Sequence, residues 1–330
     1  MVSEEMAAER ELPEERAEPG KRAGHAGRVT LREDLRAAWL DAGLGVLVTG
    51  AVFALLYARI RSGASDTVSV MPFMADAGTF WMYFLSQAFG WSALLWAWGT
   101  VLIGLLLAGP RTGRSARTQR VLERLHRTTS LSTIALITAH ALFFFAELVR
   151  FEAKLGWAAS VWKGFVETFV PGGYPSGTGQ IAIPVGQAAL YLAVPLGLLF
   201  YVRHRIGPRT WRVLHRFVIV VYVLSVWHTL LYGTNVWYDG WPRTTVWLLQ
   251  LPVAAIFLAR MVRPLRRAER LTPPAPHRRA PRHLLGWGTR WGLTASVAAA
   301  LAVVCAVLLS GNDGGRERPA PAPSSSGHGE

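Results

Sequence analysis

Cysteine is almost absent from this 330-residue chain, because Cys305 is the single one and lies within an apolar run. One thiol excludes an internal disulfide framework and a metal site built from several cysteine thiolates. Lysine is also scarce, at Lys21, Lys154 and Lys163, beside abundant arginine and alanine, a bias typical of GC-rich bacterial genomes. No short charged start leads into an apolar stretch, so we expect no cleavable signal peptide.

Acidic residues are outnumbered, with 21 Asp and Glu against 35 Lys and Arg and a formal charge of +14. Most of the basic excess lies in short segments between apolar runs. That placement is typical of the cytoplasmic loops of membrane proteins. We therefore expect no nucleic-acid partner.

Long apolar runs are the most frequent feature of the chain. About 20 such residues in a helix are needed to cross a hydrocarbon core of about 30 Å. Runs of about this kind cover residues 39–57, 79–108, 128–149, 181–202, 217–232, 244–261 and 291–310. The sequence predicts an all-α integral membrane protein, with a six-helix bundle followed by a seventh, C-terminal transmembrane helix.

The remaining segments divide the chain further. We predict a disordered cytoplasmic tail over 1–37, a six-helix domain over 38–262, a basic cytoplasmic linker over 263–290, the seventh helix over 291–310 and a disordered tail over 311–330. Between residues 155 and 169, apolar side chains recur at helical spacing, which favours an amphipathic helix at the membrane interface.

Arginine sets the orientation. The loops after the second, fourth and sixth spans are strongly basic, whereas those after the first, third and fifth are not. The positive-inside rule then predicts a multi-pass protein of the cell membrane with its N-terminus in the cytoplasm, and the composition favours a bacterial source. The third and fifth spans both run outward from the cytoplasm, so they are parallel.

Histidine pairs mark these two parallel spans. His126 and His140 lie 14 residues apart in the third span, and His215 and His228 lie 13 apart in the fifth. Histidines inside membrane helices are rare and are functional by default. Because the spans are parallel, we predict that His126 pairs with His215 near the cytoplasmic face and His140 with His228 near the outer face.

The chemistry of two separate pairs limits what they can bind. The histidines of one helix lie about 20 Å apart, which is too far to share a metal ion. Each pair offers two ligands, and haem needs only two axial ones because the porphyrin supplies the others. We interpret the four histidines as axial ligands of two haems; the alternative is helix-end histidines that meet water and lipid headgroups.

One geometric difficulty remains in the fifth span. On an ideal helix a 14-residue separation returns to within about 40° of the same face, but 13 residues give about 220°. The sequence therefore predicts an irregularity between His215 and His228. No proline lies between them to mark its position.

This arrangement resembles the ferric reductase and NADPH oxidase transmembrane superfamily over about residues 40–262. The resemblance rests on LHR at 125–127, His140, LHR at 214–216 and His228. It implies that His126, His140, His215 and His228 bind the irons of two b-type haems. Arg127 and Arg216, next to the inner ligands, are then candidate partners of haem propionates, or else ordinary positive-inside arginines.

The chain departs from that family in one respect. Only about 30 residues separate the sixth and seventh runs, and no glycine-rich fingerprint follows a strand, so we expect no flavin or NAD(P) site. The electron donor would be a separate cytoplasmic flavoprotein or a membrane quinol. The acceptor would be external: a ferric chelate, dioxygen or a periplasmic redox protein.

The sequence therefore predicts an oxidoreductase-type function, a transmembrane di-haem b-type cytochrome that moves electrons from a cytoplasmic or membrane donor to an external acceptor. Two alternatives stay open. One is a quinol-fed haem subunit that serves a partner periplasmic reductase. The other is a haem-free membrane transporter or scaffold.

Overall fold

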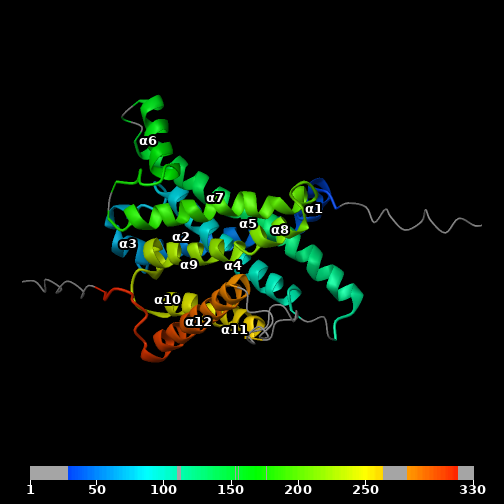
Figure 1. Cartoon of the computed structure of the whole chain (residues 1–330). Helices are drawn as coiled ribbons and strands as arrows, with labels where there is room; N and C mark the ends of the chain where they lie inside the picture. The colour runs from blue at the N-terminus through cyan, green and yellow to red at the C-terminus, as the bar shows by residue number, and fades with distance from the viewer. Residues whose placement is uncertain are drawn as a thin grey trace, which may run out of the picture.

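The computed structural model describes residues 29–109, 113–152, 154, 156–175, 177–262 and 281–318. Within these ranges the regular structure is helical, apart from one isolated bridge between Tyr238 and Arg316. Seven helices of the described part are long and apolar enough to cross a membrane. The predicted all-α membrane fold is confirmed (Figure 1).

The candidate spans have the following bounds: α2 (Trp39–Arg61), α4 (Trp81–Leu107), α5 (Ala116–Phe151), α7 (Gly179–Ile206), α8 with α9 (Pro208–His215, Val218–Tyr232), α10 with α11 (Trp241–Leu248, Gln250–Val262) and α12 (Pro281–Ser310). Shorter helices connect them: α1 (Leu31–Ala37), α3 (Asp66–Val70), η1 (Pro72–Ala75), α6 (Trp157–Phe169) and η3 (Thr234–Val236).

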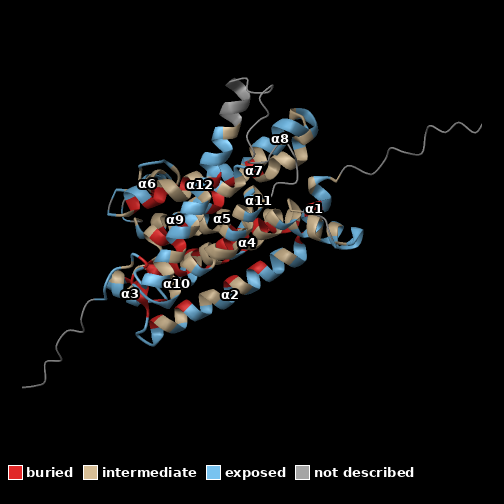
Figure 2. Ribbon diagram, turned by 60° about the horizontal axis from the view of Figure 1, so that its bottom comes forward, coloured by how far each residue is buried: buried red, intermediate tan, exposed pale blue. Residues whose placement is uncertain are grey.

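Four helices form the centre of the molecule. Helix α4 packs along α5 and α7 packs along α9, while α2 flanks α4 and the α10–α12 group covers another side (Figure 1). Leu94 and Val101 of α4 are buried against Tyr222 and Val226 of α9. Large apolar side chains of α2, such as Leu47, are exposed instead (Figure 2), as expected of a surface that faces lipid.

Three segments that the sequence placed in loops or tails are helical. Helix α5 begins at Ala116, so most of the basic stretch before the third span belongs to that span, and Ser115 caps it by accepting from the backbone N–H of Thr118 at 3.1 Å. Residues 31–37 form α1, and residues 281–290 of the predicted linker belong to α12. These predictions were wrong because arginine is a good helix former.

The predicted amphipathic helix corresponds to α6, although Leu155 lies outside the described residues. Trp157 and Trp162 are exposed on it, and the Lys163 ammonium pairs with Glu152 and Glu167. These two carboxylates raise the pKa of Lys163, chiefly through the hydrogen bond to Glu152. The helix therefore presents aromatic side chains to its surroundings and keeps its charges paired.

Residues 311–318, predicted to be a disordered tail, pack against the loop after α9. The backbone N–H of Arg316 donates to the carbonyl of Trp237 at 3.0 Å, and that of Asp239 donates to the carbonyl of Arg316 at 3.1 Å. Arg318 forms an ion pair with Asp66 of α3 at 2.6 Å. The end of α12 is thus fixed beside α3, whereas the predicted tails over 1–28 and 319–330 and the linker over 263–280 lie outside the described residues.

Candidate functional site

The four histidines of the third and fifth spans meet in two pairs. The ring centroids of His126 and His215 are 6.0 Å apart, with planes at 88°. Those of His140 and His228 are 6.1 Å apart, with planes at 72°. The structure therefore brings together the same partners that the parallel spans predicted, while their role as haem ligands stays a prediction.

The separation within each pair suits one metal ion between two imidazoles. With metal–nitrogen bonds of about 2 Å on both sides and half a ring beyond each nitrogen, the two ring centres lie roughly 6 Å apart. Among the described residues, no three or more His, Cys, Asp or Glu side chains gather to form a metal site. Each pair thus offers two protein ligands, the number that a haem iron takes.

Hydrogen bonds orient the rings. Three imidazoles hold Nδ1 against a backbone carbonyl oxygen of a neighbouring helix: His126 on Thr100 at 3.1 Å, His140 on Ser86 at 2.8 Å and His228 on Ala182 at 2.7 Å. A carbonyl oxygen only accepts, so Nδ1 carries the proton and Nε2 keeps its lone pair. Metal-binding histidines are usually held in this way.

His215 is held differently. Its ring stacks on the indole of Trp211, with centroids 5.4 Å apart and planes at 21°. Trp211 lies one helical turn before His215 in α8, so the contact is local. The inner pair is therefore fixed on one side by a backbone carbonyl and on the other by an aromatic ring.

Glycines make room for three of the rings. A Cβ atom on Gly186 of α7 would lie 2.6 Å from Nδ1 of His228. On α4, a Cβ on Gly90 would lie 3.0 Å from Nδ1 of His140, and one on Gly104 would lie 3.0 Å from Cε1 of His126. A side chain on Gly186 would therefore force the ring of His228 to move, and one on Gly90 or Gly104 would make an unusually tight contact with an imidazole.

Sequence reasoning missed these glycines, although a signal was present. Gly90 and Gly104 are 14 residues apart, the same separation as His126 and His140 on the antiparallel neighbour α5. Equal spacing on adjacent antiparallel helices places each glycine opposite one histidine. A matched pair of small residues could therefore have indicated the packing partner of α5.

The irregularity predicted for the fifth span lies directly after His215. Helix α8 ends there and α9 begins at Val218. Four backbone hydrogen bonds between residues 213 and 220 join an N–H to the carbonyl three residues earlier. Each residue of such a turn rotates about 120° instead of 100°, which changes the 13-residue rotation from about 220° to about 300° and brings His228 towards the face of His215.

A cavity between α4, α5, α7 and α9 adjoins the outer pair, and both His140 and His228 line it. Its walls include Ile137, Leu190 and Val221, so it is largely apolar. At its outer end two buried polar atoms of the wall, Oγ1 of Thr168 and Oε1 of Gln187, have no hydrogen-bond partner within the described structure. The arrangement fits a flat apolar group with a polar edge, as haem is.

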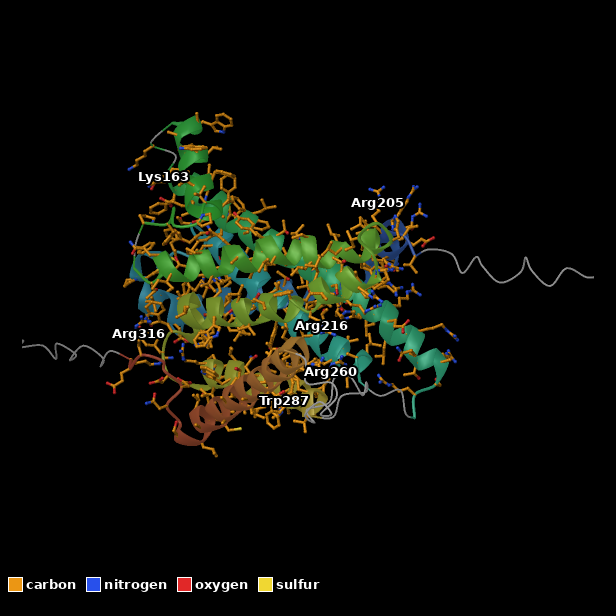
Figure 3. All side chains as sticks on the ribbon, viewed as in Figure 1. Lys163, Arg205, Arg216, Arg260, Trp287 and Arg316 are labelled. Carbon is orange, nitrogen blue, oxygen red and sulfur yellow. The ribbon has the colours of Figure 1, made fainter. Side chains whose placement is uncertain are left out.

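The two predicted propionate partners lie at the inner end. The Nε atom of Arg127 is 2.8 Å from Oδ2 of Asp34, a buried carboxylate of α1 that also accepts from the hydroxyl of Tyr201 at 2.9 Å. Arg216 directly follows His215 at the end of α8 (Figure 3). A propionate at Arg127 would compete with Asp34, which the sequence placed in a disordered tail; both arginine roles stay predictions.

Comparison with known proteins gives one match. Residues 89–226 match the family described as the ferric reductase like transmembrane component. The matched region runs from α4 into α9, contains His126, His140 and His215, and ends two residues before His228. Neither the curated proteins nor the solved structures include a match to this chain.

Proposed function

We propose that this chain is a di-haem b-type cytochrome that carries electrons across a membrane, since residues 89–226 match the ferric reductase like transmembrane component. The observation that carries the proposal is the meeting of two histidine pairs between the third and fifth spans, with ring centroids 6.0 and 6.1 Å apart. His126 and His215 would hold the inner haem, and His140 and His228 the outer one.

The residues around each pair orient the imidazoles for haem binding. When bound, each haem supplies an iron that exchanges one electron at a time. The carbonyls of Thr100, Ser86 and Ala182 hold three rings in the orientation that leaves Nε2 for the iron. Ligation of each haem by two histidines would favour electron transfer to an external acceptor over binding of that acceptor at the metal.

Electrons would enter from a cytoplasmic flavoprotein or a membrane quinol and leave to a ferric chelate, dioxygen or a periplasmic redox protein. This is oxidoreductase chemistry that needs a separate donor, since no flavin or NAD(P) site is expected in the chain. A quinol-fed subunit of a partner reductase shares the same haem sites. A haem-free transporter or scaffold does not, so a haem assay separates it first.

Purified protein is expected to contain two b-type haems per chain, because the structure holds two histidine pairs. The measurement is a pyridine haemochrome assay together with the protein concentration. Absence of haem, or haem of the c type, would contradict the proposal. One haem per chain would restrict it to a single pair.

The proposed orientation places the N-terminus in the cytoplasm and the end of α12 outside. Arg205 lies at the end of the bundle that carries α1, and Arg316 lies at the opposite end (Figure 3). The positive-inside rule supports this orientation in a cell membrane. Reporter fusions after Gly179 and after Gly311 are both expected to report an outside location. A cytoplasmic signal from the second would mean that α12 does not cross.

A further inference from the structure

One carboxylate lies inside the first span. Asp41 follows the start of α2 by two residues, whereas Asp34, seven residues earlier, pairs with Arg127 beside His126. Asp41 lies in the first turn of α2, and its carboxylate reaches the indole of Trp96 in the interior of α4, so it lies within the bundle of spans. An ionisable side chain in such a place is costly and is retained for function by default.

The two oxygens of Asp41 differ. The indole N–H of Trp96 on α4 donates to Oδ1 at 3.2 Å. Oδ2 is buried and has no hydrogen-bond partner within the described structure. A buried acceptor left without a donor costs about 1–3 kcal/mol, and lipid chains carry no donor to offer it. Asp41 therefore lacks one hydrogen-bond donor, which a hydroxyl or amine of another molecule could supply.

A shallow groove beside Asp41 can admit such a molecule. Its lining comes from α2, α4 and α5, and includes Trp96, Trp98, Gly99 and Thr129. Aromatic and small side chains thus surround one carboxylate and one hydroxyl. The groove suits a flat aromatic body with polar groups at its edge.

The groove also backs directly onto the inner histidine pair. The hydroxyl of Thr129 lies 3.3 Å from the carbonyl oxygen of His126. Gly99 precedes Thr100, whose carbonyl oxygen accepts from Nδ1 of His126 at 3.1 Å. A molecule in the groove would touch both segments of chain that hold His126 in place.

We propose that this groove binds a membrane quinol and that Asp41 accepts its proton. A quinol combines an aromatic ring for the tryptophans, a hydroxyl donor for the carboxylate of Asp41, which lines the groove, and an apolar tail that remains in lipid. The proposal rests on the proposed function and selects the membrane quinol from its two classes of donor. Asp41 is then a catalytic residue, while Trp96 positions it through Oδ1.

The reaction balances within these groups. Oxidation of one quinol to the quinone breaks two O–H bonds and releases two protons and two electrons. The carboxylate of Asp41 takes the first proton, passes it to water and then takes the second. The two electrons are accepted by the two ferric haems of the proposed function, one by each.

The test compares Asp41→Asn with the wild-type chain in proteoliposomes supplied with decylubiquinol or menaquinol-4. Asparagine keeps an oxygen that accepts from Trp96 but is not protonated near neutral pH. Quinol-driven haem reduction is expected to slow by roughly 100-fold, the scale of a lost general base, with dithionite-reducible haem unchanged. Thr49→Ala is the matched control, because it removes another α2–α4 contact, the 2.9 Å hydrogen bond to Ser92, and should keep the wild-type rate.

A binding readout is independent of haem reduction. A photoreactive azidoquinone is expected to label residues 95–103 and the neighbourhood of Thr129 in the wild-type chain, and excess decylubiquinol should prevent the labelling. Normal haem content with no labelling there, or an Asp41→Asn rate equal to wild type, overturns the quinol site and leaves the proposed function intact. Absence of haem would instead overturn the proposed function. The labelling alone would then show whether the groove binds a quinol. If Asp41→Asn does not fold, two other tests take its place. One is the labelling pattern, and the other is Asp41→Glu, which keeps the proton acceptor and should retain the quinol-driven rate.

Discussion

Replacing His140 with alanine is expected to abolish the same haem that replacing His228 abolishes. The two rings lie 6.1 Å apart on α5 and α9, at a separation that suits one iron between them. Either single variant leaves that iron with one protein ligand, so each should lose roughly half of the wild-type haem. The double variant should lose little more, since residues that act as one unit are strongly non-additive.

The inner pair provides the complementary result. His126→Ala and His215→Ala should each remove the other haem, because their rings lie 6.0 Å apart at the opposite end of the cavity-lining helices. His140→Ala should leave the inner haem reducible from the donor side while delivery to an external acceptor stops. Redox titration of the visible spectrum in membranes distinguishes the two haems in all four variants.

His204→Ala is the matched control for these four variants. His204 lies in the last turn of α7 with its side chain exposed, outside both pairs. Its replacement should leave both haems and both potentials unchanged. The pairing would be refuted if His140→Ala and His228→Ala removed haems with different spectra or potentials.

The pairing could be predicted from the sequence because it depends on few quantities. Span lengths and the distribution of arginine give the direction of each helix, and direction alone decides which histidine of α5 meets which histidine of the fifth span, formed by α8 and α9. The break between α8 and α9 could not be located in advance. Neither Arg216 nor Phe217 is a proline or glycine, so the sequence carried no signal for the tightened turn that their backbone hydrogen bonds form.

The residues that support the site were harder to foresee. Asp34 follows a polar stretch whose composition is typical of a disordered tail. Only the fold shows that α1 places the carboxylate of Asp34 beside Arg127. Gly90, Gly104 and Gly186 are ordinary residues for membrane helices, where small side chains serve many contacts. Their separations from the imidazoles emerge only when α4 and α7 are placed against α5 and α9.

Gly186→Ala is expected to displace His228 and to weaken binding of the outer haem without unfolding the protein. Alanine is the better helix former by about 0.8–1 kcal/mol, so α7 itself should gain stability. Its Cβ, however, would lie 2.6 Å from Nδ1 of His228, closer than real contacts allow. The ring must move and would lose the 2.7 Å hydrogen bond to Ala182. Overpacking of this kind costs about 1–3 kcal/mol, which corresponds to roughly 5- to 150-fold weaker retention of the haem.

Gly104→Ala serves as the counterpart at the inner pair, because its Cβ would lie 3.0 Å from Cε1 of His126 and should weaken the inner haem instead. Gly50→Ala on α2 is the control, since a Cβ there meets nothing within 4 Å and both haems should remain. The measurements are haem content after purification and the midpoint potential of each haem. If Gly186→Ala retained the outer haem at its wild-type potential, the close approach of α7 to His228 would have no part in holding the ligand. If that variant lost the inner haem as well, haem binding at one pair would depend on the other pair. The glycines would then affect the packing of the whole bundle and not the position of a single imidazole.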